Sequence, residues 1–271
     1  MSDSKFDNWL VRWNLAQDGE AIMAGQSSSL LLPVLHDGAR AILKIAIDEE
    51  EIRGGDMMDW YSGHGAAKVL AHEGPALLLE RLSGPRDLTT MARSGDDDEA
   101  TEIICAVVAR LHAPKERAPP KSLVPTRIWF RQLDPAADRY GGILKTCAIA
   151  ARGLLAHPQN VVPLHGDVHH GNILDGGARG WLAIDPKGVL GERAFDYANL
   201  FRNPDACFAG EPDRLRRRLD IVTRAASLEP KRLLTWILAY AGLGAAWTMD
   251  SGGQDEAGLA IASLAAAELA A

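Results

Sequence analysis

Hydrophobic and polar positions alternate through the first third of the chain in the manner of β-strands. The segment 36–38, His-Asp-Gly, separates two of these runs and predicts a tight hairpin, because glycine adopts positive φ without steric cost. The segment 72–74, His-Glu-Gly, joins a second pair of runs. The pattern predicts a small antiparallel sheet with strands at residues 19–25, 29–35, 39–47, 66–71 and 76–82.

Helical spacing replaces this alternation in the rest of the chain. Residues 48–63 open with clustered acids, which favour a helix N-terminus, and carry apolar side chains at loosely helical intervals. From Ser83 on, the chain is mainly helical, with one strand-like hairpin embedded at 172–186 after the short apolar run 161–164. The predicted helices of this part cover residues 96–112, 127–157 with a break at the glycines 141–142, 212–226, 230–248 and 255–270.

These elements predict an α+β protein of two lobes. The N-terminal lobe, residues 1–82, carries the antiparallel sheet, and the C-terminal lobe, residues 83–271, is larger and mainly helical. A cleft between two such lobes is a common place for a ligand.

Composition narrows the classes of partner. The chain is 47% hydrophobic and 24% charged, which is ordinary for a globular protein. Its formal net charge of -7 argues against nucleic acid and suits a small cationic ligand. No apolar run reaches the roughly 18 residues of a membrane span, and no signal peptide is recognisable. The cysteines 105, 147 and 207 have no metal-ligand spacing, so we expect buried thiols in a cytoplasmic protein that is a monomer or a weak dimer.

The stretch LHGDVHHGNIL, residues 164–174, concentrates the candidate chemistry. In a phosphoryl-transfer site, Asp167 could accept a hydroxyl proton, and Asn172 and Asp185 could give Mg²⁺ the oxygen ligands it prefers. Lys44 stands alone in an apolar strand and could present its ammonium group to phosphates, although by itself it is equally typical of a surface lysine.

Two other hypotheses start from the same loop. A zinc metallohydrolase would use the side chains His165, Asp167, His169 and His170, but no second ligand cluster accompanies them. A nucleotide-binding pseudokinase would act without catalysis. The joint presence of Lys44, Asp167, Asn172 and Asp185 argues against that hypothesis.

Several ordered blocks resemble a known family. HGDVHHGN followed by AIDPKG resembles the phosphotransferase motif of the aminoglycoside phosphotransferases, an antibiotic-resistance branch of the protein-kinase-like fold. The blocks GHGAAKV, ALLLERLSG, GWLAIDPKGVLGERAFDYANLF and RLLTWILAYAGLGAAW extend the likeness from about Trp13 to the last helix. Together they are similar to the streptomycin 6-kinases, also described as aminoglycoside/hydroxyurea kinases. The resemblance implies a protein-kinase-like fold, ATP and Mg²⁺ as cofactors, and phosphorylation of a small cationic aminoglycoside, with the 6-hydroxyl of streptomycin as the leading acceptor.

The resemblance also implies roles for particular positions. It implies that Asp167 is the catalytic base and that Asn172 and Asp185 are metal ligands. Lys44 would hold the α- and β-phosphates, and adenine would dock at the hinge from Glu80 to Leu82. His165 and Asp196 would be structural supports of the loop.

The nucleotide site departs from the wider family at two places. The stretch GQSSSLLL lacks the glycine pattern of a kinase phosphate loop, so the hydroxyls and backbone of Ser27 and Ser28 would have to serve. Gly54 stands where related kinases have the helix glutamate that pairs with the lysine. We expect Glu51, one turn earlier on the same face, to replace it, with Asp56 in reserve.

Streptomycin carries guanidinium groups, so its pocket should present carboxylates. The candidates in the helical part are Glu192, Asp196, Asp205 and Asp250. We expect the basic run 214–218 to be a solvated helix face, the acidic run 96–99 to start a helix, and the tryptophans 129, 236 and 247 to lie in the core.

Overall fold

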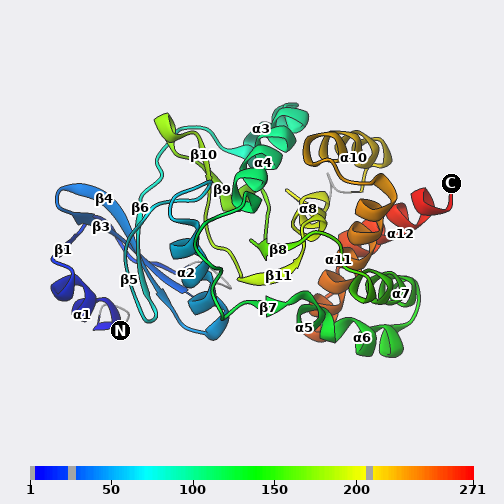
Figure 1. Cartoon of the computed structure of the whole chain (residues 1–271), viewed down its shortest axis with the longest axis horizontal. Helices are drawn as coiled ribbons and strands as arrows, with labels where there is room; N and C mark the ends of the chain where they lie inside the picture. The colour runs from blue at the N-terminus through cyan, green and yellow to red at the C-terminus, as the bar shows by residue number, and fades with distance from the viewer. Residues whose placement is uncertain (1–3, 24–28, 206–209) are drawn as a thin grey trace.

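The computed structural model describes residues 4–23, 29–205 and 210–271. Its main sheet is antiparallel, with the strand order β1-β3-β4-β6-β5, and β2 also pairs with β3 (Figure 1). The strands are β1 Leu15–Gln17, β2 Ile22–Met23, β3 Ser29–His36, β4 Ala39–Ala46, β5 Val69–Glu73 and β6 Ala76–Glu80. The predicted sheet is confirmed, but in the run 19–25 only two of the described residues are in a strand.

Local turn chemistry and alternation explain this sheet. Asp37 and Gly38 both have positive φ and turn β3 into β4, as the sequence predicts. Leu43 lies opposite Leu32 on one side and Leu78 on the other, and all three are buried. Helix α1, Ser4–Arg12, which the sequence analysis did not predict, adds Phe6 to this core.

Helix α2, Glu49–Tyr61, lies between the sheet and the rest of the molecule (Figure 1). Its N-terminus is fixed by Asp48, whose carboxylate accepts a hydrogen bond of 2.9 Å from the backbone N–H of Glu51. Residues Met57, Met58 and Tyr61 bury the opposite end of the helix in the large core. The predicted helix at 48–63 is therefore confirmed.

The second half of the molecule is built around α11, Pro230–Asp250, which packs on α7, α8 and α12. Proline occupies its first turn, and Trp236 and Tyr240 are buried along it. The other helices are α3 Leu88–Ser94, α4 Asp97–His112, α5 Thr126–Trp129, α6 Leu133–Tyr140, α7 Ile143–Ala156, α8 Ala194–Ala198, α10 Pro212–Ala226 and α12 Glu256–Ala270. Short 3-10 turns occupy η1 Phe130–Gln132, η2 His170–Asn172, η3 Gly177–Arg179 and η4 Asn199–Arg202. The predicted break at 141–142 is confirmed, whereas α3 was not predicted.

Two small sheets frame the polar loop between them. Strands β9, Ile173–Asp175, and β10, Trp181–Ala183, form the predicted hairpin. Strands β7, Val124–Pro125, β11, Val189–Glu192, and β8, Val161–Leu164, form a sheet in the order β7-β11-β8. The loop that begins after β8 is therefore held on both sides.

The basic run on α10 corrects a prediction. Arg214 and Arg218 are 4% and 1% exposed rather than solvated. Both bind the carboxylate of Asp97 at the start of α4, with N–O distances of 2.8 and 2.5 Å. The acidic run does start a helix, as predicted, and one of its acids also joins α4 to α10.

The chain passes from the main sheet to the helical part between Glu80 and Leu88. The predicted boundary at residues 82 and 83 falls in this segment, and the division into lobes stays a prediction. Cys105 and Cys147 are buried free thiols as expected, and Cys207 lies outside the described residues.

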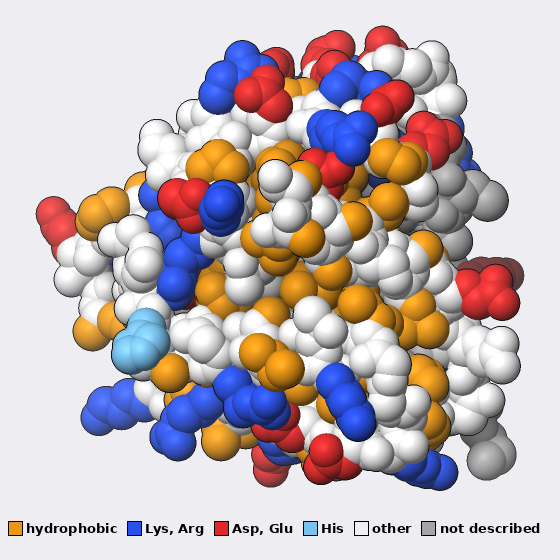
Figure 2. Space-filling model, turned by 90° about the vertical axis from the view of Figure 1, so that its right-hand side faces the viewer, with side chains coloured by type: hydrophobic (Ala, Val, Ile, Leu, Met, Phe, Trp, Pro, Cys, Tyr) orange, Lys and Arg blue, Asp and Glu red, His pale blue; other side chains and the backbone are white. Residues whose placement is uncertain are grey.

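Figure 2 shows the end of the molecule where α7, α10 and α12 lie in Figure 1. Hydrophobic side chains appear across its middle, with charged groups gathered above and below. The alanine-rich tail forms α12 there, and its Ile261, Ala262 and Ala265 are fully buried. None of the described helices is long and apolar enough to cross a membrane.

Candidate active site

The loop after β8 is fixed by two buried supports. The ring of His165 is fully buried, with Nε2 2.8 Å from the carbonyl oxygen of Ile184, and its Nδ1 accepts from the backbone N–H of Asp167. The Asp196 carboxylate accepts from the backbone N–H groups of His165 and Gly166 at 2.9 and 2.7 Å. Burial lowers the pKa of His165, which favours a neutral ring that donates from Nε2. Both residues therefore act on the geometry of the loop, as expected.

Asp167 is held by amides on both carboxylate oxygens. The side chain of Asn172 donates to Oδ2 at 3.2 Å, and that of Asn199 donates to Oδ1 at 2.9 Å. The ring of His169 lies 3.6 Å from Oδ2. Burial raises the pKa of Asp167, but His169, His165 and Lys187 outweigh it and hold the pKa below its ordinary value. An ionised carboxylate in fixed orientation, 30% exposed, is suited to accept a proton.

A second cluster lies where β4, α2 and the residues after β10 meet. Lys44 of β4 forms ion pairs with Glu51, at 2.5 Å, and with Asp185. Glu51 is 5% exposed and also accepts from the hydroxyl of Ser29 at 2.7 Å. Burial raises the pKa of Asp185, but the neighbouring lysines outweigh it and lower that pKa well below its ordinary value.

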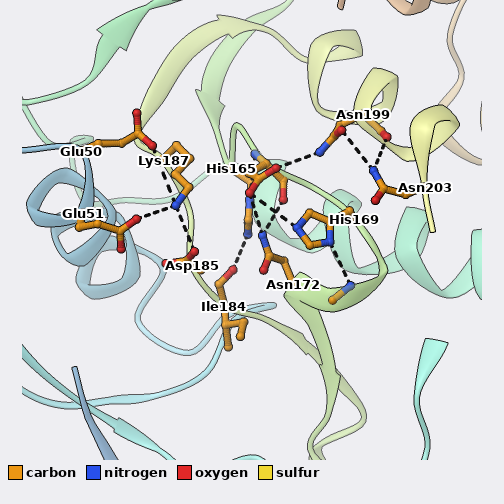
Figure 3. A network of polar contacts seen from close by, with 12 residues as sticks. Glu50, Glu51, His165, His169, Asn172, Ile184, Asp185, Lys187, Asn199 and Asn203 are labelled. Atoms are coloured by element: carbon orange, nitrogen blue, oxygen red, sulfur yellow. Dashed lines mark hydrogen bonds and ion pairs between the residues drawn. The ribbon is translucent and has the colours of Figure 1, made fainter. Parts of the chain in front are cut away.

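Lys187 is a member of this cluster that the sequence analysis did not assign. Its Nζ lies 2.7 Å from Glu51 and 3.1 Å from Asp185 (Figure 3). Burial lowers its pKa, but the two carboxylates outweigh burial and raise it. Asp185 has φ 59°, a conformation that aspartate tolerates better than most residues, and it turns the chain so that Lys187 faces α2. The block AIDPKG contains Lys187, so the motif carried a signal for it.

A cleft of about 820 Å³ opens beside Asp167. It lies between the first turn of α2, the segment from β7 to η1, the loop after β8, and α11. Its lining residues are Asp48, Glu49, Glu50, Arg53, Val124, Ile128, Trp129, Arg131, Gly166, Asp167, Lys187, Tyr240 and Trp247. The volume is in the range of small-molecule sites.

A family model described as aminoglycoside/hydroxyurea antibiotic resistance kinase matches residues 12–252. The chain belongs to this family. It is 48% identical over 248 residues to streptomycin 3''-kinase of Klebsiella pneumoniae, covering 90% of this chain and 92% of that protein. It is 33% identical over 257 residues to streptomycin 6-kinase of Streptomyces griseus, covering 89% and 81%.

The expected protein-kinase-like fold of the family is also confirmed. A thermostable mutant of aminoglycoside phosphotransferase APH(4)-Ia, solved as a ternary complex with ADP and hygromycin B, superimposes with a TM-score of 0.65 at 14% identity. The match covers 100% of this chain and 98% of that one. Family membership supports transfer of a phosphoryl group to a hydroxyl and the use of ATP.

The structure leaves no room for a side chain at position 54, where the resemblance implies the helix glutamate of related kinases. A Cβ atom at position 54 would approach the carbonyl oxygen of Pro186 to less than 3.0 Å, a distance that real Cβ atoms essentially never show. Glu51 reaches Lys44 instead, as expected. Asp56, the reserve candidate, accepts from the hydroxyl of Ser122 at 2.7 Å.

The remaining predicted nucleotide positions are the hinge from Glu80 to Leu82 and the serines 27 and 28. The Glu80 carboxylate accepts from the backbone N–H of Lys68 at 2.6 Å and binds Arg179, so it is engaged within the protein. Leu82 is partly buried against the large core. The adenine role of Glu80 to Leu82 stays a prediction. Ser27 and Ser28 lie outside the described residues.

The predicted acceptor carboxylates do not line the cleft. Glu192 is 3% exposed and pairs with Arg232 at 2.6 Å, and Asp196 lies beneath the loop. Asp205 pairs with Arg93 at 2.7 Å, and Asp250 is the last residue of α11. Apart from Asp167, the acids that line the cleft are Asp48, Glu49 and Glu50 at the N-terminus of α2.

The tryptophans lie in the core and at the cleft. Trp236 is 1% exposed, as predicted. Trp129 and Trp247 are partly buried against the large core and also line the cleft, with their rings edge to face and centroids 5.9 Å apart. These two rings give the cleft an aromatic surface in addition to the core contacts that the sequence analysis predicted.

The geometry does not support the zinc hypothesis. In residues 4–23, 29–205 and 210–271, no group of three or more His, Cys, Asp or Glu side chains is placed to hold a metal ion. His165 uses both ring nitrogens within the protein, and Nδ1 of His169 accepts from the backbone of Gly171. His170 is 1% exposed, and burial, reinforced by the charge of Arg218, lowers its pKa to about 3.

Asn199 is the second functional candidate that the sequence analysis missed. Its amide is itself oriented by Asn203, which donates to the Asn199 carbonyl and side-chain oxygens at 2.9 and 3.3 Å. Arg218 donates in turn to the carbonyls of Leu200 and Asn203. A chain of contacts therefore runs from Asp97, through Arg218 and the two asparagines, to the Asp167 carboxylate.

Proposed function

We propose that the chain transfers the γ-phosphoryl group of ATP to a hydroxyl of streptomycin. The observation that carries the proposal is the fixed Asp167 carboxylate, which lines the same cleft as Lys187. Family membership and the two streptomycin kinases among the relatives support the acceptor. A cleft of about 820 Å³ is also much larger than hydroxyurea, the other acceptor in the family description, would need.

The proposed reaction is a single displacement. The acceptor oxygen forms a bond to the γ-phosphorus while the bond from that phosphorus to the bridging oxygen breaks, which releases ADP. Asp167 accepts the hydroxyl proton as the new bond forms. Such a reaction needs positioning and charge stabilisation more than covalent chemistry.

The lysines are the proposed phosphate ligands. Lys44 and Lys187 carry two positive charges on one side of the site. Glu51 holds them at 2.5 and 2.7 Å, and Asp185 forms ion pairs with both lysines, at 3.1 Å with Lys187. Salt bridges of this kind fix the direction of an ammonium group that would otherwise rotate freely. The pair Lys44 and Glu51 is thus the proposed counterpart of the lysine and helix glutamate of related kinases.

Asn172 and Asp185 fit a magnesium ion by their chemistry. Mg²⁺ takes hard oxygen ligands and often uses only one or two protein carboxylates together with substrate phosphates. The amide nitrogen of Asn172 donates to Asp167, so its amide oxygen is the atom that would hold the ion. A bound magnesium ion would neutralise charge on the nucleotide phosphates.

The hydroxyl that is phosphorylated is a finer question. The sequence analysis favours the 6-hydroxyl, but the relative with 48% identity is a 3''-kinase, whereas the 6-kinase has 33% identity. We therefore propose the 3''-hydroxyl as the first candidate and keep the 6-hydroxyl as the second.

The test is ADP release in a coupled assay with purified protein, ATP, Mg²⁺ and a panel of aminoglycosides, with streptomycin first. Phosphorus–proton correlation spectra of the product distinguish the 3'' and 6 positions. ATP-dependent phosphorylation of streptomycin is the expected result. Absence of turnover with every aminoglycoside would refute the proposal, and nucleotide binding without turnover would favour a pseudokinase.

A further inference from the structure

The lining of the cleft includes an acidic group and an aromatic group of side chains. The first turn of α2 brings Glu49 and Glu50 to the acidic part, next to the capping residue Asp48. The aromatic part of the lining contains Trp129, Tyr240 and Trp247. Arg53 and Arg131 also line the cleft, so its charge is mixed rather than uniformly acidic.

Tyr240 presents a hydroxyl that the protein leaves unpaired. The residue is 4% exposed and lines the cleft from α11. Within the described part of the chain, its hydroxyl makes no hydrogen bond, although its ring packs edge to face on Phe195 with centroids 5.2 Å apart. The buried polar atoms that lack a partner do not include this hydroxyl, so it is open to the cleft. A ligand in the cleft would provide a partner without any movement of the ring.

Glu50 presents a carboxylate that is incompletely compensated. Its oxygen lies 4.0 Å from Nζ of Lys187, whereas Glu51 and Asp185 bind that ammonium group at 2.7 and 3.1 Å. Figure 3 shows Lys187 between the two adjacent glutamates. Burial is the main reason that the pKa of Glu50 is raised, with Lys187 opposing it. The Glu50 side chain is also 41% exposed, so its carboxylate is accessible to a cationic group of a ligand in the cleft.

We propose that Glu50 and Tyr240 form the acceptor subsite, in which Glu50 binds a guanidinium or ammonium group and the Tyr240 hydroxyl binds a hydroxyl of the same molecule. The inference rests on the proposed function and names two residues that would recognise a cationic polyol. Trp129 and Trp247 add aromatic faces on which a guanidinium group can stack.

The position of Glu50 should couple binding of the acceptor to binding of the nucleotide. Glu50 precedes Glu51, so one helical turn contacts the acceptor with one carboxylate and Lys44 with the next. A ligand that holds Glu50 also restrains Glu51, and by linkage each ligand should tighten the other by the same factor. Streptomycin should therefore bind more tightly when the ATP analogue AMP-PNP is present.

The experiment compares Glu50→Gln and Tyr240→Phe with two matched controls. Asp56→Asn makes the same charge change on the same helix, where the carboxylate contacts Ser122 instead of the cleft. Tyr61→Phe removes a hydroxyl that is buried in the core and has no partner there. Thermal unfolding checks that all four variants remain folded.

The readout is the KM for streptomycin at saturating ATP, together with the KM for ATP. We expect Glu50→Gln to raise the first about tenfold, the loss of one charge-assisted hydrogen bond, and Tyr240→Phe to raise it about fivefold. The KM for ATP should change less than about twofold in Tyr240→Phe and should rise in Glu50→Gln only by the factor by which the two ligands tighten each other. Both controls should match the parent protein. A parent-like KM for streptomycin in both cleft variants would overturn the subsite.

Binding without turnover separates this inference from the proposed function. If the parent protein phosphorylates no aminoglycoside, calorimetric titration with streptomycin still tests the subsite, with and without AMP-PNP. Weaker binding to Glu50→Gln than to Asp56→Asn would then support the subsite while the proposed function fails. Equal binding to the two variants, or no binding to the parent protein, would overturn the subsite.

Discussion

Gly54 sets the distance between α2 and the segment that follows Asp185, so Gly54→Ala tests how far the site depends on that contact. The added Cβ would lie less than 3.0 Å from the carbonyl oxygen of Pro186, where ordinary contact begins at 3.4 Å. A backbone oxygen cannot rotate away as a side-chain end can. Helix α2 or the segment 185–188 must therefore shift.

The expected magnitude follows from opposing effects. Alanine in place of glycine stabilises a helix by about 1 kcal/mol, whereas overpacking costs about 1–3 kcal/mol, so the net loss of stability is small. The shift matters more for the site, because the hydrogen bond from Lys187 to Glu51 is 2.7 Å and a further 1 Å would break it. A misplacement of about 1 Å can lower turnover about 100-fold, and we expect a loss of roughly 10- to 100-fold in kcat/KM.

The assay is kcat/KM for ATP with saturating acceptor, alongside thermal unfolding. Gly55→Ala is the matched control, because its Cβ would meet only the end of the His72 side chain, at 3.2 Å, which can move. The control should keep its activity and unfold at an equal or higher temperature. Gly54→Ala with parent-like kcat/KM would show that the spacing of α2 and the segment 185–188 does not control the site.

Three further results are expected. Asp167→Asn should lower kcat about 10²–10⁴-fold and leave ATP affinity nearly unchanged. Unchanged turnover in the coupled assay would show that Asp167 is not the catalytic base. Asn199→Ala should lower kcat about tenfold with both KM values retained, since it frees one carboxylate oxygen of Asp167; a change confined to KM would contradict this positioning role. Burial raises the pKa of Asp97, but Arg214 and Arg218 outweigh burial and lower it, so its contribution to stability is present above about pH 4 and lost as the pH falls through the lowered pKa. Asp97→Asn should therefore lower the free energy of unfolding by about 3–5 kcal/mol at pH 7, and by less at a pH below the lowered pKa of Asp97. Urea unfolding at the two pH values measures both losses, and equal losses would contradict the ion pairing.

Local chemistry made part of this fold predictable. The β3–β4 hairpin follows from Asp37 and Gly38, and α2 from its capping acid, because both depend on neighbours in the sequence. The loop holding Asp167 and Asn172 is also short enough for its spacing to indicate a shared site. Helix α1 carries Phe6, Trp9 and Leu10 at helical spacing, a signal that the prediction missed, whereas α3 is too short to show a clear period.

Contacts between distant segments were not predictable in the same way. Lys187 meets Glu51 across 136 positions, and Asn199 meets Asp167 across 32. The burial of Arg214 depends on Asp97, 117 positions away, so the basic run alone indicates a solvated face. The place of Trp129 and Trp247 at the cleft was missed for the same reason, because it depends on how α5 and α11 bring the two rings together.

The contacts from Asp97 through Arg218 and the two asparagines have a consequence for how variation would be tolerated. In a library of variants selected for growth on an antibiotic, the residues around the cleft would form one region that resists change. A second such region should appear on α10, around the buried Arg218, although the cleft is lined by other elements. Substitutions there would leave ligand affinity intact and be removed by selection through slower turnover or lower abundance.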